Sequence, residues 1–290
     1  MEIEPQLLKT MEKKFSLHRR FDRMGRLVGH SAMKVLAETH VVVVGVGGVG
    51  SFAAESLARS GVGKITLVDY DEICVTNLNR QIHALSPLIG EKKVKVMADR
   101  LRQINPQGEF IAKVQFCNAE TVEALLTPKP NYVIDAIDNL KAKCVLLDYC
   151  RKNKIRVVCS GGAGSRLDPL AVEVKDLSET SEDPFLAQIR KDLRTKFSWP
   201  SDQTFGIPTV FSREPAHESQ WLPYDGAEGF ECVCPQGQNG VNQCDRKTIV
   251  HGTASFVVGS FGLALSSLIV GDVLSLSDSP ISKRSAFWES

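Results

Sequence analysis

Four glycines and one aspartate give this sequence its clearest chemical signal. Residues 41–50 read VVVVGVGGVG, and Asp69 closes a second apolar run 19 residues after Gly50. The glycines of this loop are Gly45, Gly47, Gly48 and Gly50. In a GxGxxG pattern, the first glycine allows a tight turn, the second lets a phosphate approach the backbone, and the third lets a helix pack close to the strand. Because Asp69 is placed to accept hydrogen bonds from ribose hydroxyl groups, the pattern predicts a bound nucleotide, although it does not choose between NAD and ATP.

Four polar clusters favour ATP over a dinucleotide. They read DYD at 69–71, NLNRQ at 77–81, GEKK at 90–93 and DAIDN at 135–139. In an open parallel sheet, ligands bind at the carboxyl ends of the strands, where we expect all four clusters to meet. The side chains predicted to line this crevice are Asp69, Asp71, Asn77, Arg80, Lys93 and Asp138. Two cations and several acids suit a nucleoside triphosphate with Mg²⁺, because an acid can hold the metal and the cations can stabilise charge on the departing pyrophosphate.

Several of these residues also have purely structural interpretations. Asp138 can be the N-cap of the helix that follows it. Lys93 can lie on a solvated helix face, and Arg80 can tie down its own loop through an internal ion pair. His83 and His251 can each be structural or can face a substrate.

The elements that must position these residues alternate along the chain. Apolar runs predict strands at 41–44, 64–69, 109–114, 131–136 and 155–162. Helical patterns predict a helix that ends near residue 60 and further helices at 91–104, 118–127 and 139–153. This alternation predicts an α/β fold with a doubly wound, mostly parallel, Rossmann-like sheet.

The flanking regions complete a single domain of residues 1–290. We expect residues 1–40 to form an N-terminal helical arm, 41–164 the nucleotide-binding core, and 165–290 a C-terminal extension of loops and antiparallel structure for the substrate. The elements predicted in that extension are an antiparallel or edge strand at 171–176, a helix at 184–196, a long loop at 198–247 that could close over a site, and an apolar helix at 252–271.

Charge and composition narrow the class of protein. The chain has 35 basic and 34 acidic residues, so its formal net charge of +1 implies no general attraction to polyanions. Basic residues gather at 1–40 and 141–156, and each run is either a local binding surface for an anionic partner such as RNA or a solvated helix face. A further basic run lies at 190–196. The N-terminus has no apolar secretory segment, so we expect a cytoplasmic protein with free thiols. Residues 248–271 contain no Asp, Glu, Lys or Arg, and we interpret them as a helix buried in the core or in a dimer interface rather than as a membrane span.

Together these motifs resemble the HesA/MoeB/ThiF group of adenylating enzymes, which are similar to ubiquitin-activating enzymes. In that group, ATP activates a carboxylate as an acyl-adenylate and pyrophosphate is released. The resemblance implies that the four glycines form the phosphate loop and that Asp69 binds ribose. It assigns Asn77 and Arg80 to an NxxR signature, Lys93 to the phosphates and Asp138 to Mg²⁺.

The same resemblance implies a homodimer. In relatives, an arginine of the N-terminal helix reaches into the site of the neighbouring subunit. The segment RFDRMGRL offers Arg20, Arg23 and Arg26, of which Arg23 is the nearest match to the motif.

A narrower resemblance concerns the substrate. The segments RFDRMGRLVG, VTNLNRQIHAL, RQINP, YVIDAID, YCRKNKI and SGGAG are similar to those of the tRNA threonylcarbamoyladenosine dehydratases. The likeness is close over residues 20–180 and looser over 252–271. It implies a ligase that uses ATP to adenylate the threonyl carboxylate of N6-threonylcarbamoyladenosine in tRNA, after which the carbamoyl group closes a ring with net loss of water. It also allows a protein partner from a sulfur-transfer system.

Adenylation of the C-terminal glycine of a small sulfur-carrier or ubiquitin-like protein remains the alternative function. Relatives of that kind often carry two CxxC pairs for structural zinc. In this chain the nearest approach is Cys232, Cys234 and Cys244, whose spacing makes a poor zinc site. These thiols can instead form a disulfide or include a reactive group. A nicotinamide-dependent oxidoreductase is a second alternative, based on the glycine pattern alone.

Overall fold

A seven-stranded sheet forms the centre of the computed structural model, which describes residues 16–222 and 250–277. The strands are β1 (His40–Val44), β2 (Lys64–Val68), β3 (Glu109–Lys113), β4 (Tyr132–Asp135), β5 (Arg156–Ser160), β6 (Val172–Asp176) and β7 (Pro208–Ser212). Their order is β3-β2-β1-β4-β5-β7-β6, and every neighbouring pair is parallel except β6 and β7. The predicted doubly wound, mostly parallel sheet is therefore confirmed, with its strand order reversing between β1 and β4.

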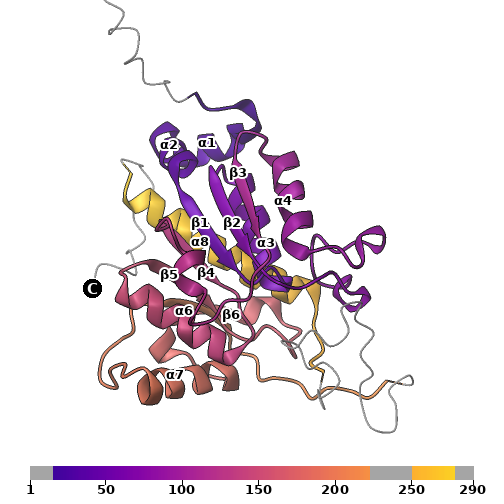
Figure 1. Cartoon of the computed structure of the whole chain (residues 1–290), viewed down its shortest axis with the longest axis vertical. Helices are drawn as coiled ribbons and strands as arrows, with labels where there is room; N and C mark the ends of the chain where they lie inside the picture. Colours follow the sequence, from indigo (N-terminus) through magenta and orange to yellow (C-terminus); the bar gives the residue numbers. More distant parts are fainter. Residues whose placement is uncertain (1–15, 223–249, 278–290) are drawn as a thin grey trace, which may run out of the picture.

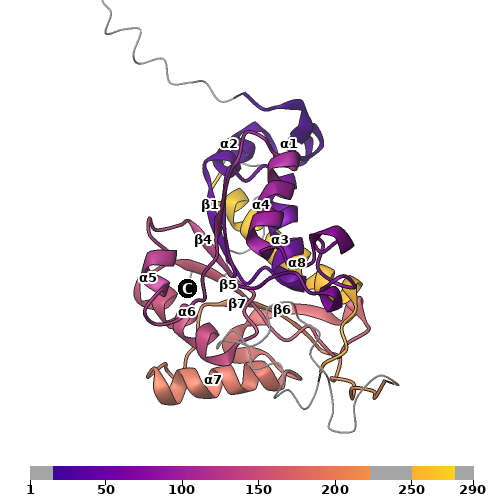
Figure 2. The same ribbon diagram turned by 45° about the vertical axis from the view of Figure 1, so that its right-hand side comes forward.

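Helices cover both faces of the sheet (Figures 1 and 2). They are α1 (Asp22–Val28), α2 (His30–Glu38), α3 (Gly48–Arg59), α4 (Lys93–Ile104), α5 (Val122–Leu125), α6 (Leu140–Lys152), α7 (Pro184–Lys196) and α8 (Ser255–Ser275). The valine run of β1 shows why two layers are needed, because successive side chains of a strand point to opposite faces. Val41 and Val43 pack in the core with α3, α4 and α8, whereas Val42 and Val44 pack in the core with α5, α6 and α7.

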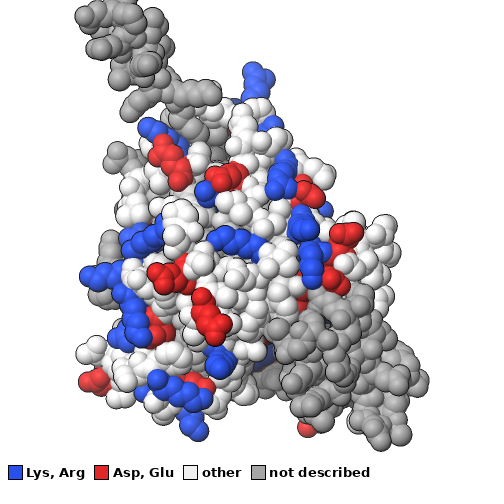
Figure 3. All heavy atoms as spheres, viewed as in Figure 1, with Lys and Arg blue, Asp and Glu red and all other residues white. Residues whose placement is uncertain are grey.

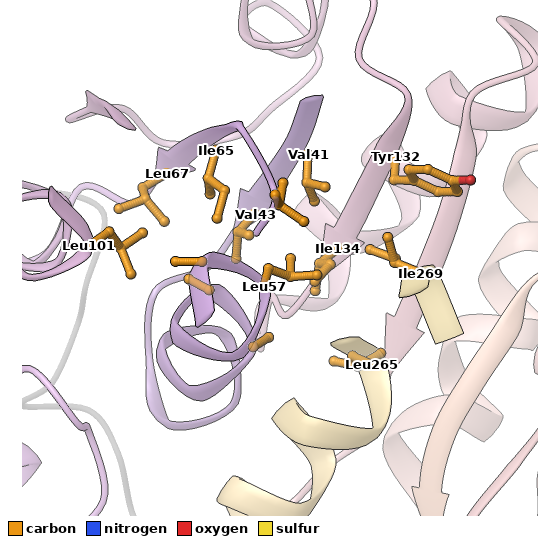
Figure 4. Close-up of a cluster of buried hydrophobic side chains, with 14 of the residues drawn as sticks. Val41, Val43, Leu57, Ile65, Leu67, Leu101, Tyr132, Ile134, Leu265 and Ile269 are labelled. Atoms are coloured by element: carbon orange, nitrogen blue, oxygen red, sulfur yellow. The ribbon is translucent and has the colours of Figure 1, made fainter. Parts of the chain in front are cut away.

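The apolar helix predicted at 252–271 is a core helix, observed as α8. By length and composition it could cross a membrane, but 61% of its most apolar stretch is buried inside the molecule. It lies against α3, where a Cβ on Gly262 would stand 2.5 Å from the carbonyl oxygen of Val49. The Ser266 hydroxyl donates to the carbonyl oxygen of Ala53 at 3.0 Å. Figure 4 shows Leu265 and Ile269 of this helix reaching toward Ile134 of β4. Close helix contact, rather than lipid, therefore accounts for the apolar sequence.

The C-terminal extension contains one strand that the sequence analysis missed. The edge strand at 171–176 and the helix at 184–196 are confirmed as β6 and α7. The prediction of a long loop at 198–247 is wrong for residues 208–212, which form β7, a buried strand between β5 and β6. Residues 223–249, with the three cysteines of the loop, lie outside the described residues.

The cysteines of the described core are free and buried. They are Cys74, Cys117, Cys144, Cys150 and Cys159. The last four belong to the hydrophobic core beneath α5, α6 and α7. Burial raises the pKa of the Cys159 thiol to about 12, so this side chain stays protonated at neutral pH.

A buried ion pair joins β4 to α6. The Lys143 ammonium lies 2.9 Å from a carboxylate oxygen of Asp135, and neither side chain is exposed to solvent. The same ammonium also donates to the carbonyl oxygen of Ile137 at 3.2 Å. Lys143 belongs to the basic run at 141–156, so the interpretation of that run as an RNA surface is wrong at this position. An ammonium with no solvent contact must have its partner inside the protein.

Removing one member of this pair should be costly. We expect Lys143→Met to lower the free energy of unfolding by about 3–5 kcal/mol, because Asp135 would remain as a buried charge without its partner. Urea denaturation followed by circular dichroism measures this change. Lys141→Met, on the exposed side of the same helix, is the matched control and should change stability by less than about 0.5 kcal/mol. An equally stable Lys143→Met variant would show that the pair does not hold β4 to α6.

Candidate active site

The turn between β1 and α3 needs glycine at two places. Gly45 has a φ of +90°, and a Cβ on it would lie 2.5 Å from the carbonyl oxygen of Ala136. A Cβ on Gly50 would lie 1.9 Å from the carbonyl oxygen of Gly45. The first glycine therefore lets the chain turn against the end of β4, and the third lets α3 begin directly beneath that turn.

The two middle glycines have different surroundings. A Cβ on Gly47 would meet no atom nearer than the Gln81 side-chain nitrogen, at 3.9 Å. This open space is where a phosphate could approach the backbone. A Cβ on Gly48 would instead lie 3.1 Å from Val258, so this residue packs against the start of α8. Gly47 is thus the position of the loop that faces open space at the N-terminus of α3, where the helix dipole favours an anion.

Asp69 connects the end of β2 to this turn. One of its carboxylate oxygens accepts a hydrogen bond from the backbone nitrogen of Val46 at 2.8 Å, and the other accepts from the backbone nitrogen of Asp71 at 2.9 Å. Burial raises the pKa of the Asp69 carboxyl, while the nearby ammonium of Lys93 acts to lower it. Because each carboxylate oxygen has two lone pairs, these contacts leave room for the predicted hydrogen bonds to ribose.

Lys93 is buried, so its alternative interpretation as a residue of a solvated helix face is wrong. Its side chain is 7% exposed, and its ammonium lies 2.7 Å from a carboxylate oxygen of Asp71. Burial by itself lowers the pKa of this ammonium, but Asp69 and Asp71 outweigh burial and raise the pKa above its ordinary value. The crevice therefore contains a fixed positive charge at the start of α4.

Arg80 and Asn77 are held in the loop that follows β2. The side-chain oxygen of Asn77 accepts from the backbone nitrogen of Cys74 at 3.0 Å, and an Arg80 guanidinium nitrogen donates to the carbonyl oxygen of Thr76 at 2.7 Å. Burial lowers the pKa of the Arg80 guanidinium, and the charge of Asp138 acts in the opposite direction. The loop thus fixes one guanidinium nitrogen through its own backbone.

Asp138 is exposed and is not the cap of α6. The cap is Asn139, whose side-chain oxygen accepts from the backbone nitrogen of Ala142 at 3.0 Å. The N-cap interpretation of Asp138 is therefore wrong. Its charge acts to raise the pKa of both Arg80 and Lys93.

The donors around Asp138 are compatible with Mg²⁺. Within residues 16–222 and 250–277, no three His, Cys, Asp or Glu side chains gather as a complete set of metal ligands. Mg²⁺ is commonly bound by one or two carboxylates together with water and substrate phosphates. A single exposed carboxylate beside an open phosphate loop fits that mode of binding.

The N-terminal arginines do not reach this crevice within one chain. Arg23 is exposed on α1, Arg26 pairs with Asp22 at 2.9 Å, and Arg20 donates to the carbonyl oxygen of Ile104 at 3.1 Å. The helix that follows them, α2, leads into the start of β1, so all three lie toward the amino ends of the strands. Entry of Arg23 into a neighbouring subunit remains a prediction.

Two side chains of this loop, Gln81 and His83, are buried, and only Gln81 was not assigned a role from the sequence. Gln81 is 5% exposed, and its side-chain oxygen has no hydrogen-bond partner among the described residues. Its position in the NLNRQ motif and its amide nitrogen near Gly47 make it a candidate ligand. His83 is packed, as one of its two interpretations required, but neither ring nitrogen has a partner in the described part of the chain. Burial lowers the pKa of His83 to about 3, which keeps the ring neutral.

His251 lies just before α8, at the same edge of the sheet. Its Nδ1 atom is 3.1 Å from the hydroxyl oxygen of Ser165, which supports a structural role. Two residues later, the carbonyl oxygen of Thr253 accepts from the side chain of Asn79 at 2.8 Å. The segment before α8 is therefore tied to the loop that carries Arg80.

Known proteins share this architecture and sequence. The ThiF family model matches residues 21–285. The tRNA threonylcarbamoyladenosine dehydratase of Escherichia coli (strain K12) is 41% identical over 245 residues, which cover 84% of this chain and 89% of that relative. The protein of the same name from Bacillus subtilis (strain 168) is 44% identical over 194 residues, 67% of this chain and 74% of the relative. A crystal structure of the E. coli enzyme in complex with ATP matches with a TM-score of 0.76 at 38% identity, over 89% of this chain and 95% of that one. The chain therefore belongs to the ThiF family.

Proposed function

We propose that this chain is an ATP-dependent tRNA threonylcarbamoyladenosine dehydratase. The observation that carries the proposal is the placement of two cations. Lys93 is linked through Asp71 and Asp69 to the backbone nitrogen of Val46. Arg80 precedes Gln81, whose side-chain nitrogen borders the open space at Gly47. A hydride-transfer enzyme has no need of this cation pair, whereas transfer of an adenylyl group does. The similarity to dehydratases that carry this name, one of them crystallised with ATP, supports the same conclusion.

The reaction divides into two steps. First, an oxygen of the threonyl carboxylate bonds to the α-phosphorus of ATP, and the bond from that phosphorus to pyrophosphate breaks. Lys93 and Arg80 would offset the negative charge that moves onto the leaving group. Second, the carbamoyl group of the same nucleoside attacks the activated carbonyl carbon, loses a proton and expels AMP. The ring closes within one molecule, so no protein nucleophile is required.

The remaining assignments belong to the same proposal. Asp69 and Asn77 would hold the nucleoside part of ATP, and Asp71 would keep Lys93 in place. Asp138 would bind Mg²⁺, which on binding would neutralise phosphate charge. A homodimer would bring Arg23 of one subunit to the site of the other. We also propose a cytoplasmic location and a possible protein partner from a sulfur-transfer system.

The full-length protein should convert the modified nucleoside when it is incubated with ATP, Mg²⁺ and tRNA that carries threonylcarbamoyladenosine. We expect the digested nucleoside to lose the mass of one water molecule, as measured by mass spectrometry. The control is the same tRNA without the modification, which should stay unchanged. An unchanged modified nucleoside, together with ATP–pyrophosphate exchange that depends on a small carrier protein, would favour carrier adenylation instead.

Loss of either cation should slow the reaction, and Lys93→Met should also lower the Tm, because Asp71 would lose its buried partner. We expect Lys93→Met and Arg80→Ala each to lower kcat by about 10²- to 10³-fold, the usual effect of removing one preorganised electrostatic group. Lys95→Ala, an exposed lysine on the same helix as Lys93, is the matched control and should retain full turnover. Steady-state kinetics with ATP and modified tRNA give both results. Wild-type turnover in the Arg80 and Lys93 variants would remove these residues from the reaction.

The two kinds of glycine in the loop should respond differently to substitution. Gly47→Val should keep the fold, since open space surrounds its Cβ, but it should abolish ATP binding by filling the approach of the phosphate. Gly50→Ala should instead lower the Tm, because its Cβ would overlap the carbonyl oxygen of Gly45. Isothermal titration calorimetry and thermal unfolding separate the two effects. Undiminished ATP affinity in Gly47→Val would place the phosphates elsewhere.

A further inference from the structure

Most cations of the basic runs at 141–156 and 190–196 have partners within the chain, although several of their side chains stay exposed. Lys143 is buried against Asp135, and the other ion pairs are Lys152–Asp148 at 2.7 Å, Arg156–Asp272 at 2.6 Å and Lys196–Asp192 at 2.7 Å. Arg151 and Arg194 lie over the rings of Trp199 and Phe205. Figure 3 shows basic and acidic side chains interspersed over the face that it presents. These acidic partners offset part of the positive charge of the two runs.

Three arginines far apart in the sequence line one cavity of about 510 Å³. It lies between the 3-10 helix Arg19–Phe21, the end of α3 and the second half of α4. Figure 2 shows the N-terminal segment beside the end of α4. The residues that line this arginine pocket are Arg20, Phe21, Arg59, Arg100, Gln103 and Ile104.

The guanidinium groups are held in place by internal contacts. Arg59 and Arg100 both donate to the carboxylate of Glu55, with Arg59 Nη2 at 2.7 Å and Arg100 Nη2 at 3.2 Å from Oε1. Burial acts to raise the pKa of Glu55, but the hydrogen bonds from both arginines lower it below its ordinary value. Arg20 is fixed by its hydrogen bond to the carbonyl oxygen of Ile104.

These contacts leave the pocket positively charged. Glu55 is only 8% exposed at its side chain and neutralises one of three guanidinium charges, so these four side chains keep an excess of two positive charges. Each guanidinium has five N–H donors, and its planar fork matches the oxygens of a phosphate. The side chains of Arg59 and Arg100 remain 59% and 37% exposed, so donors stay accessible to a ligand.

We propose that the arginine pocket binds a backbone phosphate of the tRNA substrate, an inference that rests on the proposed function. The pocket and the phosphate loop are joined by α3, on which Arg59 follows Gly48 by eleven residues, or roughly 16 Å at 1.5 Å per residue. Along α4, Arg100 follows Lys93 by seven residues, or roughly 10 Å. A stacked strand carries one phosphate per 3.4 Å of its axis, so the pocket is within reach of a phosphate roughly three to five nucleotides from the reacting nucleoside. A substrate of this length can occupy both places at once, and the second contact would position it without reading its sequence.

The test uses the full-length protein with Arg20→Ala and Arg59→Ala. Arg100 is left intact because it neutralises the buried Glu55. We expect each variant to raise KM for modified tRNA roughly tenfold, as loss of a charge-assisted hydrogen bond should. The slope of log KM against log salt should fall by about 1, whereas kcat and KM for ATP should not change. Arg102→Ala is the matched control, because Arg102 is an exposed arginine of α4 that pairs with Asp99 and does not line the pocket.

A binding measurement separates this inference from the proposed function. Fluorescence anisotropy with labelled unmodified tRNA requires no turnover. Weaker binding by the Arg20 and Arg59 variants than by the wild type and Arg102→Ala would support the pocket even if the wild type dehydrates nothing. Equal tRNA affinity and an equal salt slope in all four proteins would overturn it. A defect confined to the binding of inorganic phosphate, or of an acidic carrier protein, would also overturn it by assigning the pocket to another ligand.

Discussion

The ion pair between Asp135 and Lys143 is the constraint on which the site depends. The pair lies at the end of β4 and is buried from solvent, and its ammonium also donates to the carbonyl oxygen of Ile137. Two parts of the site are positioned by residues 135–137. Gly45 turns directly against Ala136, and Asp138 follows one residue after Ile137. Burial of two charges is expensive unless their geometry is fixed. The pair therefore fixes the end of β4, and with it the shape of the glycine turn and the position of Asp138.

Contacts between neighbouring loops then bring the remaining groups into one crevice. Asp69 links the turn after β1 to the end of β2 by a hydrogen bond, and Asp71 links Lys93 to the same end of β2 by an ion pair. The strand order reverses between β1 and β4, which is the place where open α/β sheets bind ligands. Asp69, Lys93 and Arg80 are thus each held by backbone or by an opposite charge within the protein itself. Preorganisation of this kind is what electrostatic catalysis requires.

Local patterns sufficed to predict the sheet, the glycine turn and most helices, because valine runs and glycine spacing act within a few residues. They failed where a distant partner decides the outcome. The strand β7 is five residues long and begins with proline, and only its burial between β5 and β6 makes it a strand. Lys143 looked like a surface cation because its partner is eight residues away on a different element. Asp138 was interpreted as a cap from its residue type, but the next residue, Asn139, makes the capping hydrogen bond.

The packing of α8 on α3 also bears on how the protein is made. Ser266 and Ala53, which share a hydrogen bond across this interface, are 213 residues apart in the chain. During synthesis from the N-terminus, the apolar side of α3 has no permanent cover until almost the entire polypeptide has left the ribosome. Contacts of such long sequence separation slow folding and leave hydrophobic surface open to aggregation in the meantime. Before α8 is made, the nascent nucleotide-binding half therefore exposes the apolar surface of α3 that α8 later covers.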